Sequence, residues 1–334
     1  MEIYELGEFE LACGVVLPDA KLAYQTLGQL NAAKDNAILF PTFLGAPPQG
    51  LQQWIGPGRP LDPERYFIVC PLHFGLPPSS SPSNTPVPFD RGAFPRVRIA
   101  DDVAAQHRLL SEKFGIQELQ LVLGWSVGAL QAYHWAIQFP AMVKRLASIA
   151  GAPRPSPWTR LWLHSALEEP ITGDPGWRDG FYQEAGAVQA GLRHLAHVTA
   201  LTLPPEWFFR EGEEPWRGLA FTSMEDVVAR FFEAFWLPQD PNDIVTQARK
   251  AQAADPGSGA DLATTLARIT ARTAVLAFRG DVMFPPADAA RDAALIPGAD
   301  FREIASNFGH LATFALSDKD VTAVDDALRD LLAT

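Results

Sequence analysis

The feature of this sequence that most restricts its fold is the pentapeptide Gly124-Trp125-Ser126-Val127-Gly128. It follows the short apolar run Leu119–Leu123 and leads into Gly128–Phe139, where apolar residues recur with the period of a helix. A serine in such a strand-to-helix turn has a strained backbone, and small residues two positions before and after it let strand and helix approach closely. The pattern predicts an α/β fold that presents Ser126 as a nucleophile.

The rest of the chain supports this fold class, because short apolar runs alternate with longer helical patterns. Buried strands are predicted at Asn36–Phe43, Tyr66–Leu72, Leu119–Gly124, Leu146–Gly151, Thr273–Arg279 and Asp300–Ala305. Helices are predicted at Asp101–Phe114, Gly128–Phe139, Ala287–Leu295 and Val321–Leu332. The stretch Phe9–Gly28 predicts a hairpin that turns at Leu17-Pro18-Asp19.

Two regions interrupt the alternation. Residues 75–95 are rich in proline and serine and predict a loop, which is either a solvated surface segment or a segment packed beside the functional site. Residues 153–267 contain no clear strand and hold six of the tryptophans, which favours a helical insertion. The predicted organisation is an α/β core made of residues 1–155 and 268–334, with an inserted helical lid at 156–267.

Charge and composition exclude several classes of partner. Lys and Arg number 27 against 39 Asp and Glu, for a net charge of −12, which disfavours nucleic acid and anionic membrane surfaces. There is no uncharged apolar run near 18 residues, no secretory signal and only two cysteines, so we expect a cytoplasmic protein. No nucleotide-binding motif is present, and His194 and His197 have metal-like spacing without a clear third ligand, so no cofactor or metal is expected.

A serine hydroxyl needs a base and an orienting acid to act as a nucleophile. His310 follows the last predicted strand, where the base is expected in this architecture, whereas the other six histidines precede the nucleophile, lie in its helix or fall in the lid. Asp281 directly follows the strand Thr273–Arg279, and Gly280 permits the turn that aims its carboxylate. Asp288, Asp292 and Asp300 are weaker candidates because none of them directly follows that strand.

An oxyanion hole for acyl chemistry is expected to combine two backbone N–H groups. One is the N–H of Val127, and the other lies in the turn after the first central strand, at Pro41-Thr42-Phe43-Leu44-Gly45. Leu44 is the preferred second donor and Phe43 is nearly equivalent.

The chain resembles the homoserine O-acetyltransferase-like branch of the α/β hydrolases. The resemblance rests on Leu27-Gly28-Gln29-Leu30-Asn31, Ile55–Asp62, Arg65–Val69, Ser79–Asn84, Ala105-Gln106, the Ser126 turn, Asp174-Pro175-Gly176-Trp177 and Asp281–Pro286. It implies the α/β-hydrolase fold, with a mostly parallel sheet, helices on both faces and an inserted lid. It also implies a Ser126–His310–Asp281 triad, an acyl-serine intermediate and dimers formed through lid helices.

Departures from the acetyltransferase pattern bear on the substrate. Trp125 and Val127 flank the serine where that pattern has Gly and Met, and Leu311 follows His310 where it has Asp. The lid also lacks a clear match to the arginine motif that binds the homoserine carboxylate, and Arg217, Arg230 and Arg249 are equal candidates for that role.

Three functions follow in order of preference. The first is a hydrolase of small acyl esters, in which water resolves the acyl-serine. The second is an acyltransferase that uses acetyl-CoA or another acyl donor and a small hydroxylated acceptor. The third is an inactive hydrolase fold used for binding, which the intact candidate triad opposes.

Overall fold

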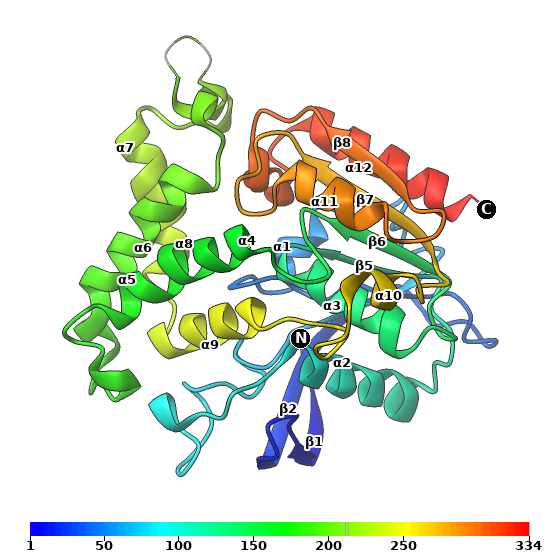
Figure 1. The fold of residues 1–334 in the computed structure, drawn as a ribbon, viewed down its shortest axis with the longest axis horizontal. Helices are drawn as coiled ribbons and strands as arrows, with labels where there is room; N and C mark the ends of the chain where they lie inside the picture. The colour runs from blue at the N-terminus through cyan, green and yellow to red at the C-terminus, as the bar shows by residue number, and fades with distance from the viewer. Residues whose placement is uncertain (211, 213, 334) are drawn as a thin grey trace.

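The computed structural model describes residues 1–210, 212 and 214–333, and one eight-stranded sheet runs through it in the order β1-β2-β4-β3-β5-β6-β7-β8 (Figure 1). The strands are β1 (Glu2–Glu10), β2 (Val16–Leu27), β3 (Ala37–Leu39), β4 (Phe67–Pro71), β5 (Leu121–Trp125), β6 (Arg145–Ile149), β7 (Arg272–Phe278) and β8 (Asp300–Ile304). From β4 to β8 all neighbours are parallel, while β2 pairs antiparallel with β1 and with β4. The mostly parallel sheet that we predicted is therefore confirmed.

Helices cover both faces of this sheet, as the side chains of β7 illustrate. Val275 and Ala277 pack against the helix α11 (Pro286–Ala293). Their neighbours Ala274, Leu276 and Phe278 belong to the main core, which also contains apolar residues of α12 (Asp318–Leu332). Because successive side chains of a strand point to opposite faces, α11 and α12 cover opposite sides of β7. The other core helices are α1 (Gln49–Gln52), α2 (Ile99–Arg108), which continues as a π-helical segment over Leu109–Phe114, and α3 (Val127–Gln138).

The described part of the chain between β6 and β7 forms helices and no strand. These helices are α4 (Pro157–Trp162), α5 (Glu169–Thr172), α6 (Gln189–Thr202), α7 (Met224–Val227), α8 (Ala234–Trp236), α9 (Pro241–Gln252) and α10 (Leu262–Leu266), with short 3₁₀ and π segments between them. Helices α5, α6 and α7 stand to one side of the sheet, whereas α9 turns back toward the core (Figure 1). The exact lid boundaries at residues 156 and 267 stay a prediction. Within the described residues, no helix combines the length and the apolarity needed to cross a bilayer.

The hairpin forms, but the predicted turn position is wrong. The chain turns over residues 11–15, where the Gly14 N–H donates to the Leu11 carbonyl and Gly14 adopts a φ of 81°. Pro18 lies inside β2 instead, at an irregularity in the pairing between β1 and β2. A proline lacks the N–H that the ladder needs, so it is tolerated at such an interruption and does not by itself mark a turn.

The first central strand is also shorter than predicted. β3 ends at Leu39, and the following residues leave the strand while still contacting the sheet, since the Phe40 N–H donates to the Val69 carbonyl and the Thr42 N–H to the Pro71 carbonyl. The residues from Phe40 to Leu44 are nevertheless buried. Apolar residues therefore continue past the end of the strand and form the loop that reaches the site described below.

The proline-rich loop is not a solvated segment throughout. Ser79, Ser80 and Ser81 are buried, and the hydroxyls of Ser79 and Ser80 accept hydrogen bonds from the backbone of β2. Ser83 donates through its hydroxyl to Asp243 on α9 at 2.6 Å. The loop thus connects β2 to α9.

Candidate active site

Ser126 occupies a sharp turn between β5 and α3. Its backbone has φ 52° and ψ −119°, which is an unfavourable conformation for a residue with a side chain. The surroundings enforce this turn, since an added Cβ at Gly124 would lie 2.1 Å from the Gly128 carbonyl oxygen, and one at Gly128 would lie 2.7 Å from that of Pro41. Both glycines are therefore required, and the turn has the geometry expected of a nucleophile elbow.

Asp281 lies in the turn that follows β7. Gly280 before it has a φ of 78°, and Oδ1 of Asp281 accepts the backbone N–H groups of Met283 and Phe284, each at 2.9 Å. These two bonds fix the carboxylate and leave Oδ2 free to face the next loop. The Asp281 side chain is fully buried.

His310 lies between Asp281 and Ser126 and contacts both. Its Nδ1 lies 2.7 Å from Oδ2 of Asp281, and its Nε2 lies 3.1 Å from Oγ of Ser126. A carboxylate only accepts hydrogen bonds, so Nδ1 carries the proton and Nε2 is free to accept the serine proton. The structure thus brings the three predicted residues together with the geometry of a Ser-His-Asp triad, while their catalytic roles stay a prediction.

Two neighbours hold the histidine in place. The backbone N–H of His310 donates to the carbonyl of Leu203, just after α6, at 3.1 Å. The ring of Phe284 stacks on the imidazole with 5.7 Å between the centroids. The lid and the turn after β7 therefore both contribute to the orientation of this side chain.

A small cavity opens beside Ser126 and His310. Its volume is about 50 Å³. Apart from Ser126 and His310, the lining consists of apolar and aromatic side chains and one threonine: Phe43, Leu44, Trp162, Leu167, Leu203, Phe235, Trp236, Met283, Thr313 and Phe314. Leu44 and Phe43 both line it, so the two alternatives for the second oxyanion donor lie on the same wall. Val127, the predicted first donor, is the first residue of α3.

None of the three arginines that we considered for binding a carboxylate lines this cavity. Arg217 pairs with Glu214, Arg230 pairs with Asp226 at 3.0 Å, and Arg249 pairs with Glu168 at 2.7 Å. His197 of the α6 histidine pair contacts Glu233, and no group of three or more His, Cys, Asp or Glu side chains among the described residues is placed to hold a metal ion.

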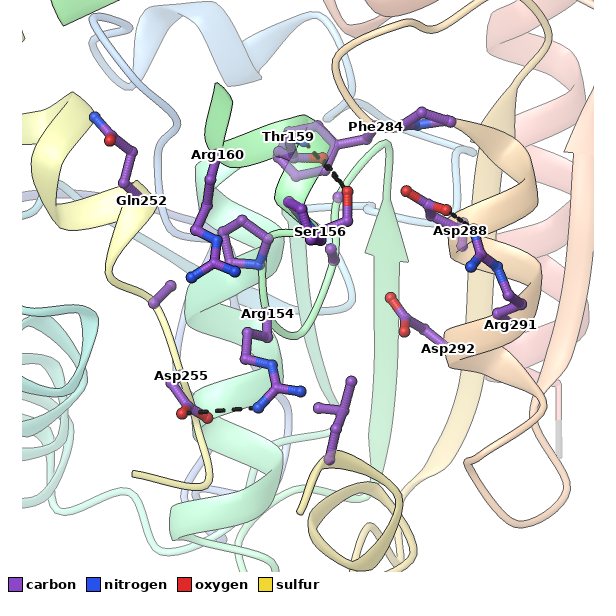
Figure 2. Close-up of a pocket in the computed structure, with 18 of the residues that line it drawn as sticks. Arg154, Ser156, Thr159, Arg160, Gln252, Asp255, Phe284, Asp288, Arg291 and Asp292 are labelled. Atoms are coloured by element: carbon purple, nitrogen blue, oxygen red, sulfur yellow. Dashed lines mark hydrogen bonds and ion pairs between the residues drawn. The ribbon is translucent and has the colours of Figure 1, made fainter. Parts of the chain in front are cut away.

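A second, larger cavity of about 650 Å³ includes Phe284 in its lining (Figure 2). It is bordered by Arg154, which lies just before the lid, by Arg160 of α4 and by Asp288, Arg291 and Asp292 of α11. Burial raises the pKa of Asp292 to about 7, against the opposing effect of Arg291 and Arg154. Charges of both signs border this cavity, which distinguishes it from the apolar cavity at Ser126.

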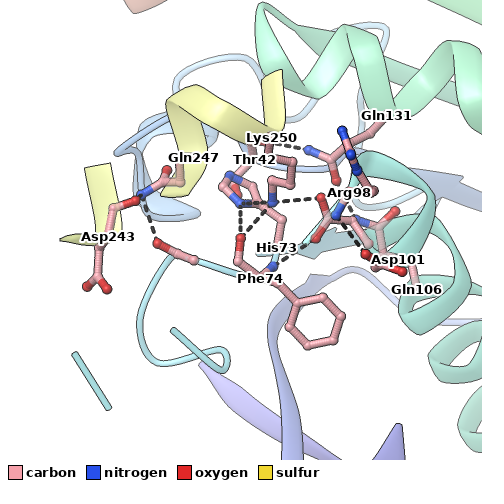
Figure 3. A network of polar contacts seen from close by, with 12 residues as sticks. Thr42, His73, Phe74, Arg98, Asp101, Gln106, Gln131, Asp243, Gln247 and Lys250 are labelled. Atoms are coloured by element: carbon pink, nitrogen blue, oxygen red, sulfur yellow. Dashed lines mark hydrogen bonds and ion pairs between the residues drawn. The ribbon is translucent and has the colours of Figure 1, made fainter. Parts of the chain in front are cut away.

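Sequence analysis missed a buried polar network beneath the loop that follows β3 (Figure 3). Lys250 of α9 and Asp102 of α2 form an ion pair at 2.7 Å with both side chains 0% exposed. The Lys250 Nζ also donates to the Phe74 carbonyl and lies 3.0 Å from Nδ1 of His73. Burial raises the pKa of Asp102 to about 6 and lowers that of Lys250. The only sequence signal for this network is the presence of polar residues on the apolar side of two amphipathic helices.

Residues 38–314 match the family model described as the alpha/beta hydrolase fold. The chain belongs to this family. An ethyl acetate hydrolase from Pseudomonas veronii is 40% identical over 100% of this chain and 95% of the relative. The crystal structure of an acetylester hydrolase from Corynebacterium glutamicum has a TM-score of 0.96 at 39% identity and covers 100% of this chain and 96% of the other.

Within the α/β hydrolases, the chain lies in the branch that contains homoserine O-acyltransferases and esterases, as its motifs indicated. A homoserine O-acetyltransferase from Thermobifida fusca is 34% identical over 98% of this chain and 93% of the relative. The similarity to the ester hydrolases is thus higher than the similarity to this transferase.

Proposed function

We propose that this α/β hydrolase cleaves small acyl esters of uncharged alcohols through an acyl-serine intermediate. The observation that carries the proposal is the cavity at Ser126, which is about 50 Å³ in volume and has no Asp, Glu, Lys or Arg side chain in its lining. A transferase that takes an amino-acid acceptor needs a cationic partner for the carboxylate and an anionic partner for the ammonium. An acetyl-sized group and a plain alkyl alcohol need neither.

The first half of the reaction forms the acyl-serine. Nε2 of His310 takes the proton of the Ser126 hydroxyl while Oγ attacks the carbonyl carbon of the ester. The carbonyl oxygen becomes negative and accepts hydrogen bonds from the backbone N–H groups of Val127 and Leu44. The C–O bond to the alcohol then breaks, and the alcohol leaves with the proton held by His310.

The second half repeats these steps with water. His310 takes a proton from water as the oxygen attacks the acyl carbon, and it returns that proton to Oγ of Ser126 as the acid is released. Asp281 keeps the proton on Nδ1 throughout and stabilises the imidazolium. Neither step calls for a cofactor, and we retain the prediction that none is bound.

One experiment compares water and homoserine as acceptors of the acyl group. The protein is incubated with p-nitrophenyl acetate or acetyl-CoA, with and without homoserine, and free acetate and acetyl-homoserine are quantified. We expect acetate from the ester at a rate that homoserine does not change. Acetyl-homoserine formed faster than acetate would show a transferase. A Ser126→Ala variant that still turned over the ester or reacted with a fluorophosphonate would refute the acyl-serine.

We further propose a cytoplasmic homodimer formed through lid helices. Trp158 and Leu161 on α4 and Leu201 on α6 are large apolar side chains that a lone chain leaves exposed, and contact with a second copy would bury them. Cys13 and Cys70 are free thiols, which is compatible with a reducing compartment. Light scattering of the wild type and of Leu201→Asp tests the assembly, because a charge in the interface should yield monomers.

A further inference from the structure

Helix α9 comes from the inserted segment but packs into the core beneath the loops that follow β3 and β4 (Figure 3). The helix begins at Pro241, where the Asp240 carboxylate accepts the N–H groups of Asn242 and Asp243. Near its other end, Lys250 forms the buried ion pair with Asp102. Both ends of α9 are therefore fixed, and its middle turn has a defined position against the core.

Gln247 lies in that middle turn and is 0% exposed. Its Oε1 accepts the backbone N–H of Gly45 at 2.9 Å, and its Nε2 donates to the carbonyls of Gly75 and Asp243 at 2.9 and 3.1 Å. One partner is a donor and two are acceptors, so only one orientation of the amide satisfies all three. Gln247 thus connects α9 to the loop after β3 with a fixed side chain.

Gly45 directly follows the predicted oxyanion donor Leu44. The Leu44 N–H belongs to the peptide group between Phe43 and Leu44, and the peptide groups on either side are both held. The earlier one is held at the Thr42 carbonyl, which accepts from Nε2 of Gln131 at 3.1 Å, and the later one is held at the Gly45 N–H by Gln247. The intervening group is also held at its own Phe43 carbonyl, which accepts the Ala46 N–H at 3.2 Å, so with both neighbours fixed it has little freedom to rotate.

We propose that Gln247 is a positioning residue for the oxyanion hole, which aims the Leu44 N–H by holding the adjacent peptide group. The inference rests on the proposed acyl-serine chemistry. Donors of an oxyanion hole act on charge that develops in the transition state, so a misaimed donor lowers kcat more than it changes substrate binding. Among the described polar residues of α9, Gln247 is the one whose side chain bonds to Gly45 in the loop after β3, so the proposed role is specific to it.

The test compares Gln247→Leu and Gln247→Glu with Gln252→Leu. Gln252 is on the same helix and donates to Glu168 at 2.7 Å, away from the loop, so it is a matched control for the loss of one amide. We expect Gln247→Leu to lower kcat for p-nitrophenyl acetate by about 10- to 100-fold, with KM within about twofold of the wild type. Binding of a trifluoromethyl ketone, which forms a tetrahedral adduct on serine, should weaken by a similar factor. Gln252→Leu should change neither.

Gln247→Glu keeps an oxygen that can accept the Gly45 N–H, so it should recover part of the kcat lost in Gln247→Leu. Circular dichroism and thermal unfolding show whether each variant folds. If Gln247→Leu does not fold, the kinetics of Gln247→Glu still test the proposal. Wild-type kcat in folded Gln247→Leu, or equal losses in Gln247→Leu and Gln252→Leu, would overturn the proposal. If the wild type did not hydrolyse esters, the proposed function would be wrong. The role of Gln247 could still be tested, because the rate at which a fluorophosphonate labels Ser126 also depends on the orientation of the oxyanion donors.

Discussion

Oγ of Ser126 and Nε2 of His310 lie 3.1 Å apart, although 184 residues of sequence separate them. Three loops at the carboxyl ends of β5, β7 and β8 create this proximity, since each turns just after its strand leaves the sheet. The distance is short enough for direct proton transfer. The geometry therefore makes definite predictions for each residue of the group.

Removal of the base should abolish turnover without loss of the fold. We expect His310→Ala to lower kcat by about 10⁴-fold or more, and Asp281→Asn to lower it by about 10⁴-fold, because the asparagine no longer selects the correct tautomer. Steady-state kinetics measure the effect, and circular dichroism checks the fold. His164→Ala and Asp300→Asn, which alter residues outside the cavity, should have near-wild-type turnover. A similar turnover in His310→Ala would show that another histidine is the base.

The size of the apolar cavity should limit the acyl chain. Phe235 lines this cavity and is half-buried, so Phe235→Ala should enlarge it. We expect the ratio of kcat/KM for p-nitrophenyl hexanoate to that for p-nitrophenyl acetate to rise at least about tenfold. Leu161→Ala removes a lid side chain that does not line the cavity and should leave the ratio unchanged. If the ratio stayed constant in Phe235→Ala as well, this wall would not contact the substrate.

The buried ion pair between Lys250 and Asp102 should be costly to break on one side only. Lys250→Met leaves the Asp102 carboxylate buried without its partner, and we expect the free energy of unfolding to fall by about 3–5 kcal/mol in urea titrations. The double variant Lys250→Met with Asp102→Leu should lose less, because no unpaired charge remains. Lys144→Met, which breaks a surface pair with Glu118, should cost less than about 1 kcal/mol. A double variant less stable than Lys250→Met would contradict this account.

Asp292 should make stability depend on pH. Its pKa is raised to about 7 in the folded protein, whereas an unfolded aspartate has a pKa of about 3.9. Between these values the folded state binds more protons than the unfolded state, so this group makes the free energy of unfolding decrease as pH rises from about 4 to about 7. Asp292→Asn removes that contribution.

Urea titrations between pH 5 and pH 8 measure the difference. The advantage of Asp292→Asn over the wild type should increase with pH by about 1 kcal/mol or more across this interval. Asp326→Asn alters an exposed carboxylate of α12 and should follow the wild-type curve. Parallel curves for Asp292→Asn and the wild type would mean that the carboxylate is already ionised at pH 5.

The sequence was sufficient to predict the parts of the site that depend on local pattern. Ser126 was recognisable because glycines at fixed spacing stand between an apolar run and a helical pattern, and Asp281 and His310 because each follows a predicted strand. The hairpin turn predicted at Leu17-Pro18-Asp19 is wrong because an irregularity in the pairing between β1 and β2 accommodates Pro18 inside the strand. The strand predicted at Asn36–Phe43 is longer than β3 because the apolar residues after Leu39 are buried in a loop, and an apolar run does not show where a buried strand ends.

The contacts of α9 with the core could not be predicted from local sequence pattern. Gln247 and Lys250 are ordinary polar residues in a helix sequence, and their partners Gly45 and Asp102 lie more than 140 residues earlier in the chain. Only the tertiary packing of α9 against the core turns them into buried, fully bonded groups. The apolar lining of the cavity is similar, since it combines residues from the loop after β3, the lid and the loop after β8.

The separation of β6 from β7 by the lid also sets the order in which the active site is completed during protein synthesis. The ribosome makes Ser126 and its elbow early, then about 120 residues pass between the end of β6 and the start of β7. Asp281 and His310 come last. In the proposed mechanism, a chain whose translation stops within the lid has Ser126 without its base, so we expect partly made copies not to hydrolyse esters.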